Sequence, residues 1–184
     1  VVLNYGSGNV RSVVRALERA GADVVLTADK KQALDAYGLV VPGVGAFRAC
    51  MDGLAAVKGP EIIGRRLAGS RPVLGICVGM QVLFQHGSEH GVETDGCFEW
   101  PGKVERLQAE VIPHMGWNSV EVPHGSQLFA GAEGERFYFV HSYALTAQNR
   151  DHVASRCDYG GKFVAAVARD NLFGTQFHPE KSQQ

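Results

Sequence analysis

The sequence predicts an α/β protein in three layers: a mostly parallel central sheet, helices on both faces of that sheet, and an antiparallel or mixed extension in the C-terminal half. In the first half of the chain, short apolar runs alternate with segments of helical periodicity, as they do where helices connect parallel strands. In the second half, strand-like runs follow one another closely and helical periodicity is scarce. We therefore expect a single domain over residues 1–184.

The composition agrees with a single domain and argues against nucleic-acid-binding and membrane-spanning functions. Of the 184 residues, 45% are hydrophobic and 20% are charged, and the formal net charge is -1. Such a chain can bury a full core, and its charge gives no basic surface for nucleic acid. No apolar run is long enough to cross a membrane. The four cysteines include no C-x-x-C pair, which indicates reduced thiols in a cytoplasmic protein.

The chain opens with a strand, a tight turn and a helix. We expect a buried strand at 1–5 and a glycine turn at 6–9, in which Asn9 is a candidate N-cap. Apolar residues then recur at helical spacing until Gly21 ends the helix. The turn lacks the third glycine of a dinucleotide-binding fingerprint and the lysine of a phosphate loop, so we expect no phosphate site there. Further strands are expected at 24–26 and 39–41.

A glycine-rich loop follows the third strand. Pro42 cannot donate to a ladder, so we expect the strand to end before it. Gly43 and Gly45, on either side of Val44, allow the backbone to approach another group closely. Enzymes with a nucleophile elbow draw one oxyanion-hole N–H from such a loop; the alternative is an ordinary connection. Helices are expected at 46–57 and 61–68.

The candidate nucleophile lies in Gly75-Ile76-Cys77-Val78-Gly79. The apolar run 73–76 predicts a buried strand, and 80–84 predicts the first turns of a helix. A cysteine between two glycines at such a turn is typical of a nucleophile elbow, in which larger side chains two positions away would collide. The helix N-terminus favours a thiolate, and the Val78 N–H can stabilise an oxyanion. The alternative is a small buried cysteine at the end of a core strand.

The second half carries strands and scattered histidines. His86 and His90 have the spacing of helical metal ligands, but Gly87 and Ser88 between them disfavour a helix, so no metal site is expected. We expect loop or surface positions for His114, His124 and His152. Strands are expected at 104–107, 111–112, 119–122, 137–140, 153–156, 164–168 and 173–177.

A partner for the cysteine stands near the C-terminus, in Thr175-Gln176-Phe177-His178-Pro179-Glu180. The last strand ends just before His178, at the sheet edge where Cys77 is expected. A thiolate nucleophile needs a base that takes and returns a proton. Pro179 keeps the backbone extended, so Glu180 points the same way as His178 and can orient its ring. With an elbow cysteine present, a triad of Cys77, His178 and Glu180 is favoured over a surface histidine at a strand end.

These motifs resemble those of the class I glutamine amidotransferases. Further segments narrow the resemblance to the glutaminase subunits of imidazole glycerol phosphate synthase, from histidine biosynthesis. The segments are Tyr5-Gly6-Ser7-Gly8-Asn9, Pro42-Gly43-Val44-Gly45-Ala46-Phe47, Pro113-His114-Met115-Gly116-Trp117-Asn118 and Tyr138-Phe139-Val140-His141-Ser142-Tyr143. The resemblance covers essentially the whole chain.

The resemblance implies a role for each matching position. Cys77 would attack the glutamine carboxamide and form a glutamyl thioester, and His178 would protonate the departing ammonia. The oxyanion would be held by Val78 and by the loop of Gly43, Val44 and Gly45, and the resemblance implies that this loop would turn to present its donor. The glutamine itself would be held by Gln81, Glu89, Ser142 and Tyr143.

The resemblance also implies a partner and no cofactor. Ammonia would pass to a separate cyclase subunit, a (β/α)8 barrel, and the two subunits would form a heterodimer. That barrel would make imidazole glycerol phosphate and aminoimidazole carboxamide ribonucleotide. Asn9, Met115, Trp117 and Lys181 match the family's subunit interface, and an exposed Met-Trp pair is typical of a partner surface. For Trp117 the alternative is a core residue at a strand edge.

The sequence departs from the family pattern at two places. Asn4 stands where many members carry Asp, which removes a charge beside the 6–8 turn. Members normally continue beyond the position of Gln184 with a helix that packs on the sheet, so we expect an uncovered apolar face and lowered stability.

Three other functions stay open from the sequence. The chain could serve a different synthase, although segment 113–118 argues against this. It could be a catalytically idle regulatory subunit, although the intact Cys77, His178 and Glu180 argue against that. It could be a cysteine peptidase, although Gln81 and Glu89 suit a free amino acid better than a peptide.

Overall fold

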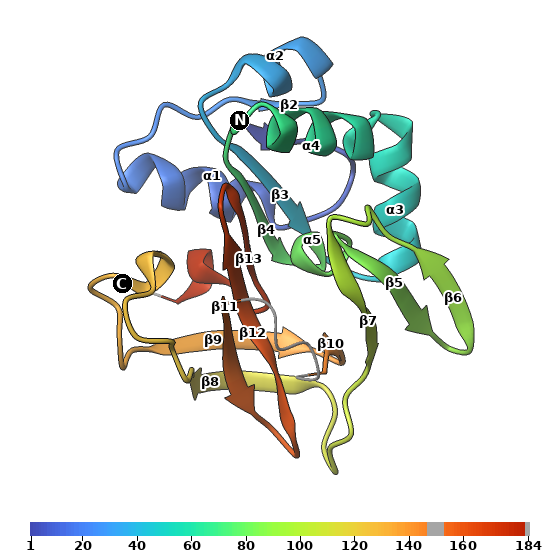
Figure 1. Ribbon diagram of the computed structural model, residues 1–184, viewed down its shortest axis with the longest axis vertical. Coiled ribbons are helices and arrows are strands. Elements are labelled where there is room, and N and C mark those ends of the chain that lie inside the picture. The colour runs from blue at the N-terminus through green and yellow to red at the C-terminus, as the bar shows by residue number, and fades with distance from the viewer. Residues whose placement is uncertain (147–152, 183–184) are drawn as a thin grey trace.

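A seven-stranded sheet forms the centre of the computed structural model, which describes residues 1–146 and 153–182 (Figure 1). Its strand order is β11-β12-β13-β4-β3-β1-β2. The strands from β13 to β2 pair in parallel, whereas β11 and β12 pair antiparallel. The bounds are β1 Val2–Leu3, β2 Leu26–Thr27, β3 Leu39–Gly43, β4 Val73–Cys77, β11 Val153–Asp158, β12 Lys162–Arg169 and β13 Leu172–Thr175.

Helices cover both faces of the parallel strands (Figure 1). On one side lies α1, Val10–Arg19. On the other side lie α3, Phe47–Ala56, and α4, Gly59–Ala68, and the short α2, Lys30–Asp35, packs on α4. The predicted α/β class with its mostly parallel sheet and mixed C-terminal extension is therefore confirmed. Helix α2 is not among the predicted elements, although Asp29 marks its start by accepting a hydrogen bond from Gln32 N at 2.7 Å.

A buried arginine joins α4 to the segment after α2. Arg66 is 1% exposed, and its guanidinium donates to the carbonyls of Ala33 and Ala36 at 2.8 Å and of Tyr37 and Pro72 at 3.0 Å. These carbonyls include those left without intrahelical partners at the end of α2. Arg66 thus provides hydrogen-bond donors for the carbonyls at the end of α2 and holds that end beside Pro72, just before β4.

The predicted end of the third strand before Pro42 is wrong, because β3 continues to Gly43 and pairs with β4 to its end. Val40 N donates to Val1 O, so Pro42, two residues on, faces the same β1 side. There β1 has already ended at Leu3, and no ladder donor is required of the proline. The Pro42 carbonyl accepts the Tyr5 hydroxyl instead.

The helix after Cys77 is shorter than predicted. Helix α5 covers only Val78–Gln81, and a strand begins at Phe84. The apolar run there is buried because it enters a second sheet, not because it continues a helix. This four-stranded sheet has the order β10-β7-β5-β6, with β5 Phe84–Glu89, β6 Val92–Asp95, β7 Trp100–Arg106 and β10 Tyr143–Leu145.

A two-stranded ribbon, β8 (His114–Ser119) with β9 (Arg136–His141), completes the described sheets. The strand expected at 111–112 is wrong: these residues form a bend before Pro113, which has no N–H to donate, and Val111 is exposed. The strand expected at 119–122 is represented only by the end of β8 and an isolated bridge at Glu121. The remaining short helices are η1 Gln127–Phe129 and η2 Pro179–Lys181.

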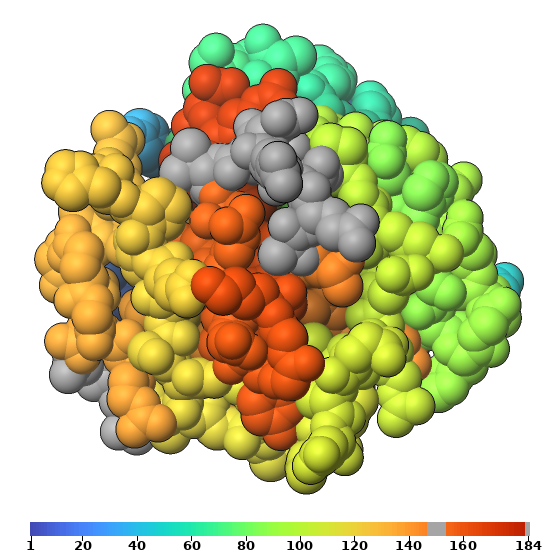
Figure 2. Space-filling view, turned by 60° about the horizontal axis from the view of Figure 1, so that its bottom comes forward, coloured from blue at the N-terminus to red at the C-terminus, as the bar shows by residue number. Residues whose placement is uncertain are grey.

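The core has two parts. The larger lies between the parallel strands and their helices. The smaller is aromatic and lies where β9, β12 and the segment after β13 meet; Phe139, Phe163 and Phe177 are its centre. On the face in Figure 2, the orange-red hairpin of β11 and β12 lies between the green segment of β5–β7 and the yellow segment after β8. No helix among the described residues is long and apolar enough to span a membrane.

Candidate active site

The candidate site lies where three neighbouring parallel strands end. Gly43 at the end of β3 pairs with Cys77 at the end of β4, and Thr175 at the end of β13 pairs with Ile76. The loop of Val44 and Gly45 therefore leaves the sheet on one side of Cys77, and the segment of His178 leaves it on the other. This is the sheet edge at which α/β proteins place their ligands.

The turn at Cys77 is strained and closely packed. Cys77 has φ 56° and ψ −116°, a conformation that residues other than glycine rarely adopt. A Cβ on Gly75 would lie 2.5 Å from Gly79 O, and a Cβ on Gly79 would lie 1.9 Å from Val41 O. Both positions therefore require glycine, for the steric reason that the sequence motif predicts. Val78 is the first residue of α5, where an N–H has no acceptor within the helix.

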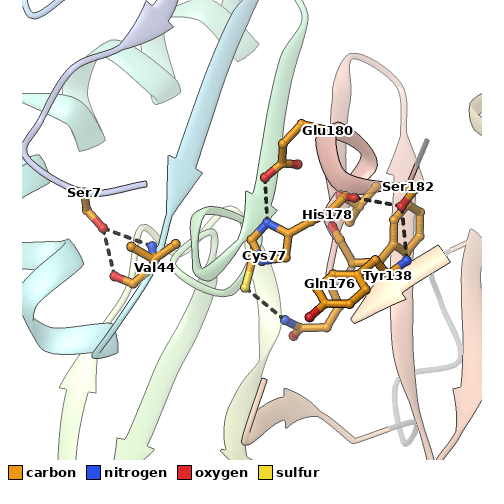
Figure 3. Close-up of polar contacts among 10 residues, drawn as sticks. Ser7, Val44, Cys77, Tyr138, Gln176, His178, Glu180 and Ser182 are labelled. Carbon is orange, nitrogen blue, oxygen red and sulfur yellow. Dashed lines mark hydrogen bonds and ion pairs between the residues drawn. The ribbon is translucent and has the colours of Figure 1, made fainter. Parts of the chain in front are cut away.

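His178 and Glu180 form a buried pair beside the nucleophile (Figure 3). His178 Nδ1 lies 2.7 Å from Glu180 Oε1, and the two side chains are 3% and 2% exposed. The backbone at His178 is extended, as expected before Pro179. Its N–H donates to Tyr138 O at 2.9 Å and its carbonyl accepts from Ser182 Oγ at 2.7 Å, which ties this segment to β9. Glu180 thus holds the imidazole ring, while Tyr138 and Ser182 hold the backbone of His178.

The surroundings of His178 favour its protonated form. Burial alone would lower the pKa of this histidine, but its hydrogen bonds and charge interactions with Cys77 and Glu180 outweigh burial and raise the pKa to about 9. An imidazolium beside a thiol sulfur is the state that can donate a proton to a leaving group. The other three cysteines, like Cys77, are free thiols, and burial raises the pKa of each of those three: Cys50, Cys97 and Cys157.

Two glutamines complete the polar surroundings of Cys77. Gln176 is fully buried, and its Nε2 lies 3.7 Å from Cys77 Sγ (Figure 3). Gln81 is also buried, and its Nε2 donates to Gln176 Oε1 and to Tyr143 O, both at 2.9 Å. Gln176 is not among the predicted site residues. Its signal is the strand period, because Gln176 and His178 are two residues apart and face the same way.

A cavity of about 270 Å³ brings the candidate residues together. Its wall includes the nucleophile, the imidazole, part of the oxyanion loop and all the expected glutamine-binding residues. They are Val44, Gly45, Cys77, Val78, Gln81, Glu89, Ser142, Tyr143 and His178. Lys181, Val140 and His141 line it as well. Gly43 lies behind this wall, buried against the elbow.

The residues expected at a partner surface lie around β8 and β9. Met115 is 61% exposed and Trp117 is 40% exposed, which disagrees with a core position for Trp117. The indole packs edge-on against Tyr138, and Lys181 Nζ lies 5.8 Å from the centre of the same phenol ring. Asn9 precedes α1, which contacts the turn of Lys181. Asn9 occupies the N-cap position, but its side chain makes no capping hydrogen bond.

The expected surface position of His114 is wrong. His114 is 2% exposed on β8, its Nδ1 lies 3.0 Å from His141 Nε2, and its ring stacks between Phe139 and Tyr159. Its side chain is buried because β8 places alternate residues on the aromatic core. His124 is exposed as expected, whereas His152 falls outside the described residues.

No metal site is evident in the described chain. His86 lies on β5 and pairs with Asp95 at 3.0 Å, away from His90 in the following turn. No group of three or more His, Cys, Asp or Glu side chains in residues 1–146 and 153–182 is placed to hold an ion.

Comparison with known proteins gives close relatives. The family described as Glutamine amidotransferase class-I matches residues 1–184. A protein of Nocardia farcinica named imidazole glycerol phosphate synthase subunit HisH is 61% identical, over 98% of this chain and 90% of its own length. A protein of the same name from Streptomyces avermitilis is 60% identical, over 99% and 89%. Among solved structures, a glutamine amidotransferase has a TM-score of 0.76 at 17% identity, over 99% and 91%. PurLQS of Thermotoga maritima has a TM-score of 0.71 at 22% identity, over 98% and 86%.

Proposed function

The chain belongs to the class I glutamine amidotransferases, and from that membership we propose that it hydrolyses glutamine to glutamate and ammonia with Cys77, His178 and Glu180. Within the family it falls with the amidotransferase subunits of imidazole glycerol phosphate synthase, an enzyme of histidine biosynthesis, because relatives of that name are 55–61% identical to it. The observation that carries the catalytic proposal is the placement of Cys77 and of His178, which pairs with Glu180, on one cavity with Gln81 and Glu89.

The first half of the reaction uses the protonated imidazole. Cys77 attacks the carboxamide carbon as a thiolate, and the negative charge moves to the carboxamide oxygen. The Val78 N–H at the start of α5 stabilises that oxygen, together with a second N–H from the loop of Gly43, Val44 and Gly45. His178 donates its proton to the departing nitrogen, which leaves as ammonia, and a glutamyl thioester remains on Cys77. Glu180 holds the ring and stabilises the imidazolium.

The second half reverses the role of the imidazole. The neutral His178 takes a proton from water, which attacks the thioester and releases glutamate. Glu89 provides a carboxylate for the substrate ammonium group; one of its oxygens already accepts a hydrogen bond from Phe47 N at 3.2 Å, which fixes its position. The backbone at Ser142 and Tyr143 receives the other end of the amino acid.

The ammonia goes to a partner subunit in this proposal. We assign that partner as a cyclase with a (β/α)8 barrel, which forms a heterodimer with this chain through Asn9, Met115, Trp117 and Lys181. The exposed Met115 and Trp117 support such an interface. No nucleic acid or membrane is involved, and a cytoplasmic location is in keeping with four free thiols.

Glutamate release from glutamine tests this function. We expect a very low rate with the chain alone and a higher rate with the cyclase subunit and its nucleotide ligand. Cys77→Ala should abolish glutamine-dependent synthesis and spare synthesis from ammonium salts, because the cyclase is unaffected. Loss of both activities in Cys77→Ala would contradict the division of labour, and glutamate release by Cys77→Ala would remove Cys77 from the reaction.

A further inference from the structure

A backbone carbonyl fixes the orientation of two buried amide side chains beside Cys77. Tyr143 O accepts a hydrogen bond from Gln81 Nε2 at 2.9 Å. A carbonyl oxygen only accepts, so Gln81 must face Tyr143 with its amide nitrogen and not with its amide oxygen. The same nitrogen donates its second hydrogen to Gln176 Oε1, also at 2.9 Å. The Gln176 amide is thereby oriented as well, and its nitrogen lies 3.7 Å from Cys77 Sγ (Figure 3).

The carbonyl that orients both amides is itself held in place. His141 Nδ1 lies 2.9 Å from Tyr143 O and must carry a hydrogen, because the carbonyl cannot donate one. His141 Nε2 then accepts from His114 Nδ1 at 3.0 Å. Both histidines are neutral at pH 7, because burial lowers the pKa of His114 to about 4 and that of His141 to about 3. Strand β10 also holds Tyr143, which pairs with Arg106 on β7.

Gln176 contacts the sulfur from outside the cavity. Its side chain is fully buried, and it is not among the residues that line the cavity of about 270 Å³. Its backbone N–H donates to Ala165 O at 2.8 Å, which fixes the residue on β12. A substrate in the cavity can reach Cys77 without touching Gln176. The Gln176 amide therefore acts on the sulfur and on Gln81, and not on the substrate.

A hydrogen bond from Gln176 favours the charged form of the sulfur. An N–H group binds a thiolate more strongly than a neutral thiol, because charge on the acceptor strengthens the bond. In the proposed reaction the sulfur carries this charge twice: when Cys77 has given its proton to His178 and attacks the carboxamide, and when it leaves the thioester as glutamate is released. The imidazole exchanges protons during the reaction, whereas the amide of Gln176 does not. The Gln176 N–H is thus available to the sulfur at both steps.

We propose that Gln176 is a catalytic residue, which donates a side-chain N–H to the thiolate of Cys77 and is oriented by Gln81 and the Tyr143 carbonyl. This proposal deepens the proposed glutaminase function and rests on it. Loss of the Gln176 N–H should lower the reactivity of the sulfur in the free chain, before any glutamine is bound. Loss of a residue that only holds the substrate would instead weaken glutamine binding and leave the sulfur as reactive as before.

The test is the rate at which iodoacetamide alkylates Cys77 in the chain without partner at pH 7, read from the mass of the peptide that contains it. Gln176→Leu removes the N–H and should slow alkylation about tenfold, because the thiolate is the reacting form. The path of the reagent is unchanged, since Gln176 lies outside the cavity. With the cyclase subunit and its ligand, kcat should fall about tenfold and KM should rise by less than about threefold, because Gln81 keeps its bond to Tyr143 O.

A matched control is Thr175→Val, at the preceding position. Thr175 is 3% exposed, and its Oγ1 donates to Phe177 O at 3.0 Å. This variant also loses a buried hydrogen bond beside Gln176, but not one to the sulfur. Its alkylation rate should stay within about twofold of the wild-type rate. Equal slowing in Thr175→Val and Gln176→Leu would assign the effect to a general disturbance of the segment and overturn the proposal.

The remaining outcomes decide the proposal in the same way. A folded Gln176→Leu chain that is alkylated at the wild-type rate but has a raised KM would show that Gln176 only holds Gln81, and would leave the glutaminase intact. A wild-type complex that releases no glutamate would overturn the function on which the proposal rests. If Gln176→Leu does not fold, the side-chain amide protons of Gln176, observed by NMR in the wild type and in Cys77→Ala, decide. They should move upfield when the sulfur is removed, and unchanged resonances would refute the hydrogen bond.

Discussion

Two regions of the molecule bury histidines, and the pKa values of these histidines are shifted in opposite directions. At the sheet edge, His178 has Cys77 and Glu180 as neighbours, and its pKa rises to about 9 although burial opposes the charge. In the aromatic core below, His114 and His141 have each other and carbonyl or ring neighbours, and burial lowers the pKa of these residues to about 4 and about 3. Burial sets only the free-energy cost of the charged imidazole, while the neighbouring carboxylate and cysteine sulfur decide whether the imidazole is charged. The first region suits proton transfer and the second suits packing.

Removing each buried histidine in turn should separate the two regions by their effect on glutaminase activity. His178→Ala should lower partner-stimulated glutamate release about 10³-fold, because general acid–base catalysis is lost. His114→Gln keeps a polar group for His141 and should leave the rate within a few-fold of wild type. The measurement is glutamate release at saturating glutamine with both subunits present. Equal losses in the two variants would break the functional distinction between the regions.

A substitution of similar size tests the negative charge of Glu180. Glu180→Gln retains a group that can accept a hydrogen bond from the imidazole but removes the negative charge, so the pKa of His178 should fall below 9. We expect kcat to fall about tenfold, since one pKa unit corresponds to a factor of ten in equilibrium. Titration of His178 by NMR, alongside kcat, checks both statements. An unchanged pKa and kcat would remove Glu180 from the proposed triad.

The two regions should also give stability opposite dependences on pH. The raised pKa of His178 contributes stability that is fully present below its ordinary value of 6.5 and is lost as pH rises through about 9. The lowered pKa values of His114 and His141 contribute stability that is present above 6.5 and is lost as pH falls towards 4. Urea unfolding of the wild-type chain at pH 5, 7 and 9 measures this.

Substitutions show which histidine is responsible for each loss of stability with pH. His178→Gln should flatten the alkaline loss of stability and leave the acid loss unchanged, and His114→Gln should do the reverse. If His178→Gln alters only the acid side, the assignment of the raised pKa to His178 is wrong.

The smallest effect concerns the connection that fixes His178 to β9. Ser182 Oγ donates to His178 O at 2.7 Å and accepts from Tyr138 N at 3.1 Å. Ser182→Ala removes both bonds and should destabilise the fold by about 1–2 kcal/mol, which lowers the melting temperature by about 2–8 °C. We expect kcat to change less than in Glu180→Gln. Ser126→Ala is a control, because Ser126 caps η1 with no side-chain hydrogen bond and should melt as the wild type does.

The sequence was sufficient where local sterics determine the structure. Gly75 and Gly79 predicted the elbow because no other residue fits beside Val41 and Met80. The two-residue spacing of His178 and Glu180 predicted their contact, but the expected extended segment is wrong beyond His178, because Pro179–Lys181 form the short helix η2. Local pattern could not predict that β3 continues past Pro42, since this depends on where its neighbour β1 ends.

Long-range partners account for the other differences. Phe84 belongs to the run 80–84 that predicted a helix and yet begins β5, because its pairing with Trp100 on β7 outweighs local propensity. The buried position of His114 likewise depends on His141, and the place of Ser7 depends on Val44 in another loop. The strand period places Gln176 on the same side as His178, but the local sequence does not show that Gln176 approaches Cys77.

The distribution of thiols has a practical consequence for counting working molecules. Burial raises the pKa of Cys97 and Cys157 to about 12 and also raises that of Cys50, so these sulfurs stay protonated and unreactive near neutral pH. Cys77 lines an open cavity beside a histidine that can accept its proton. A haloacetamide in slight excess would therefore alkylate this one sulfur first. The mass added per chain, read at the moment activity disappears, would give the fraction of competent sites in any preparation.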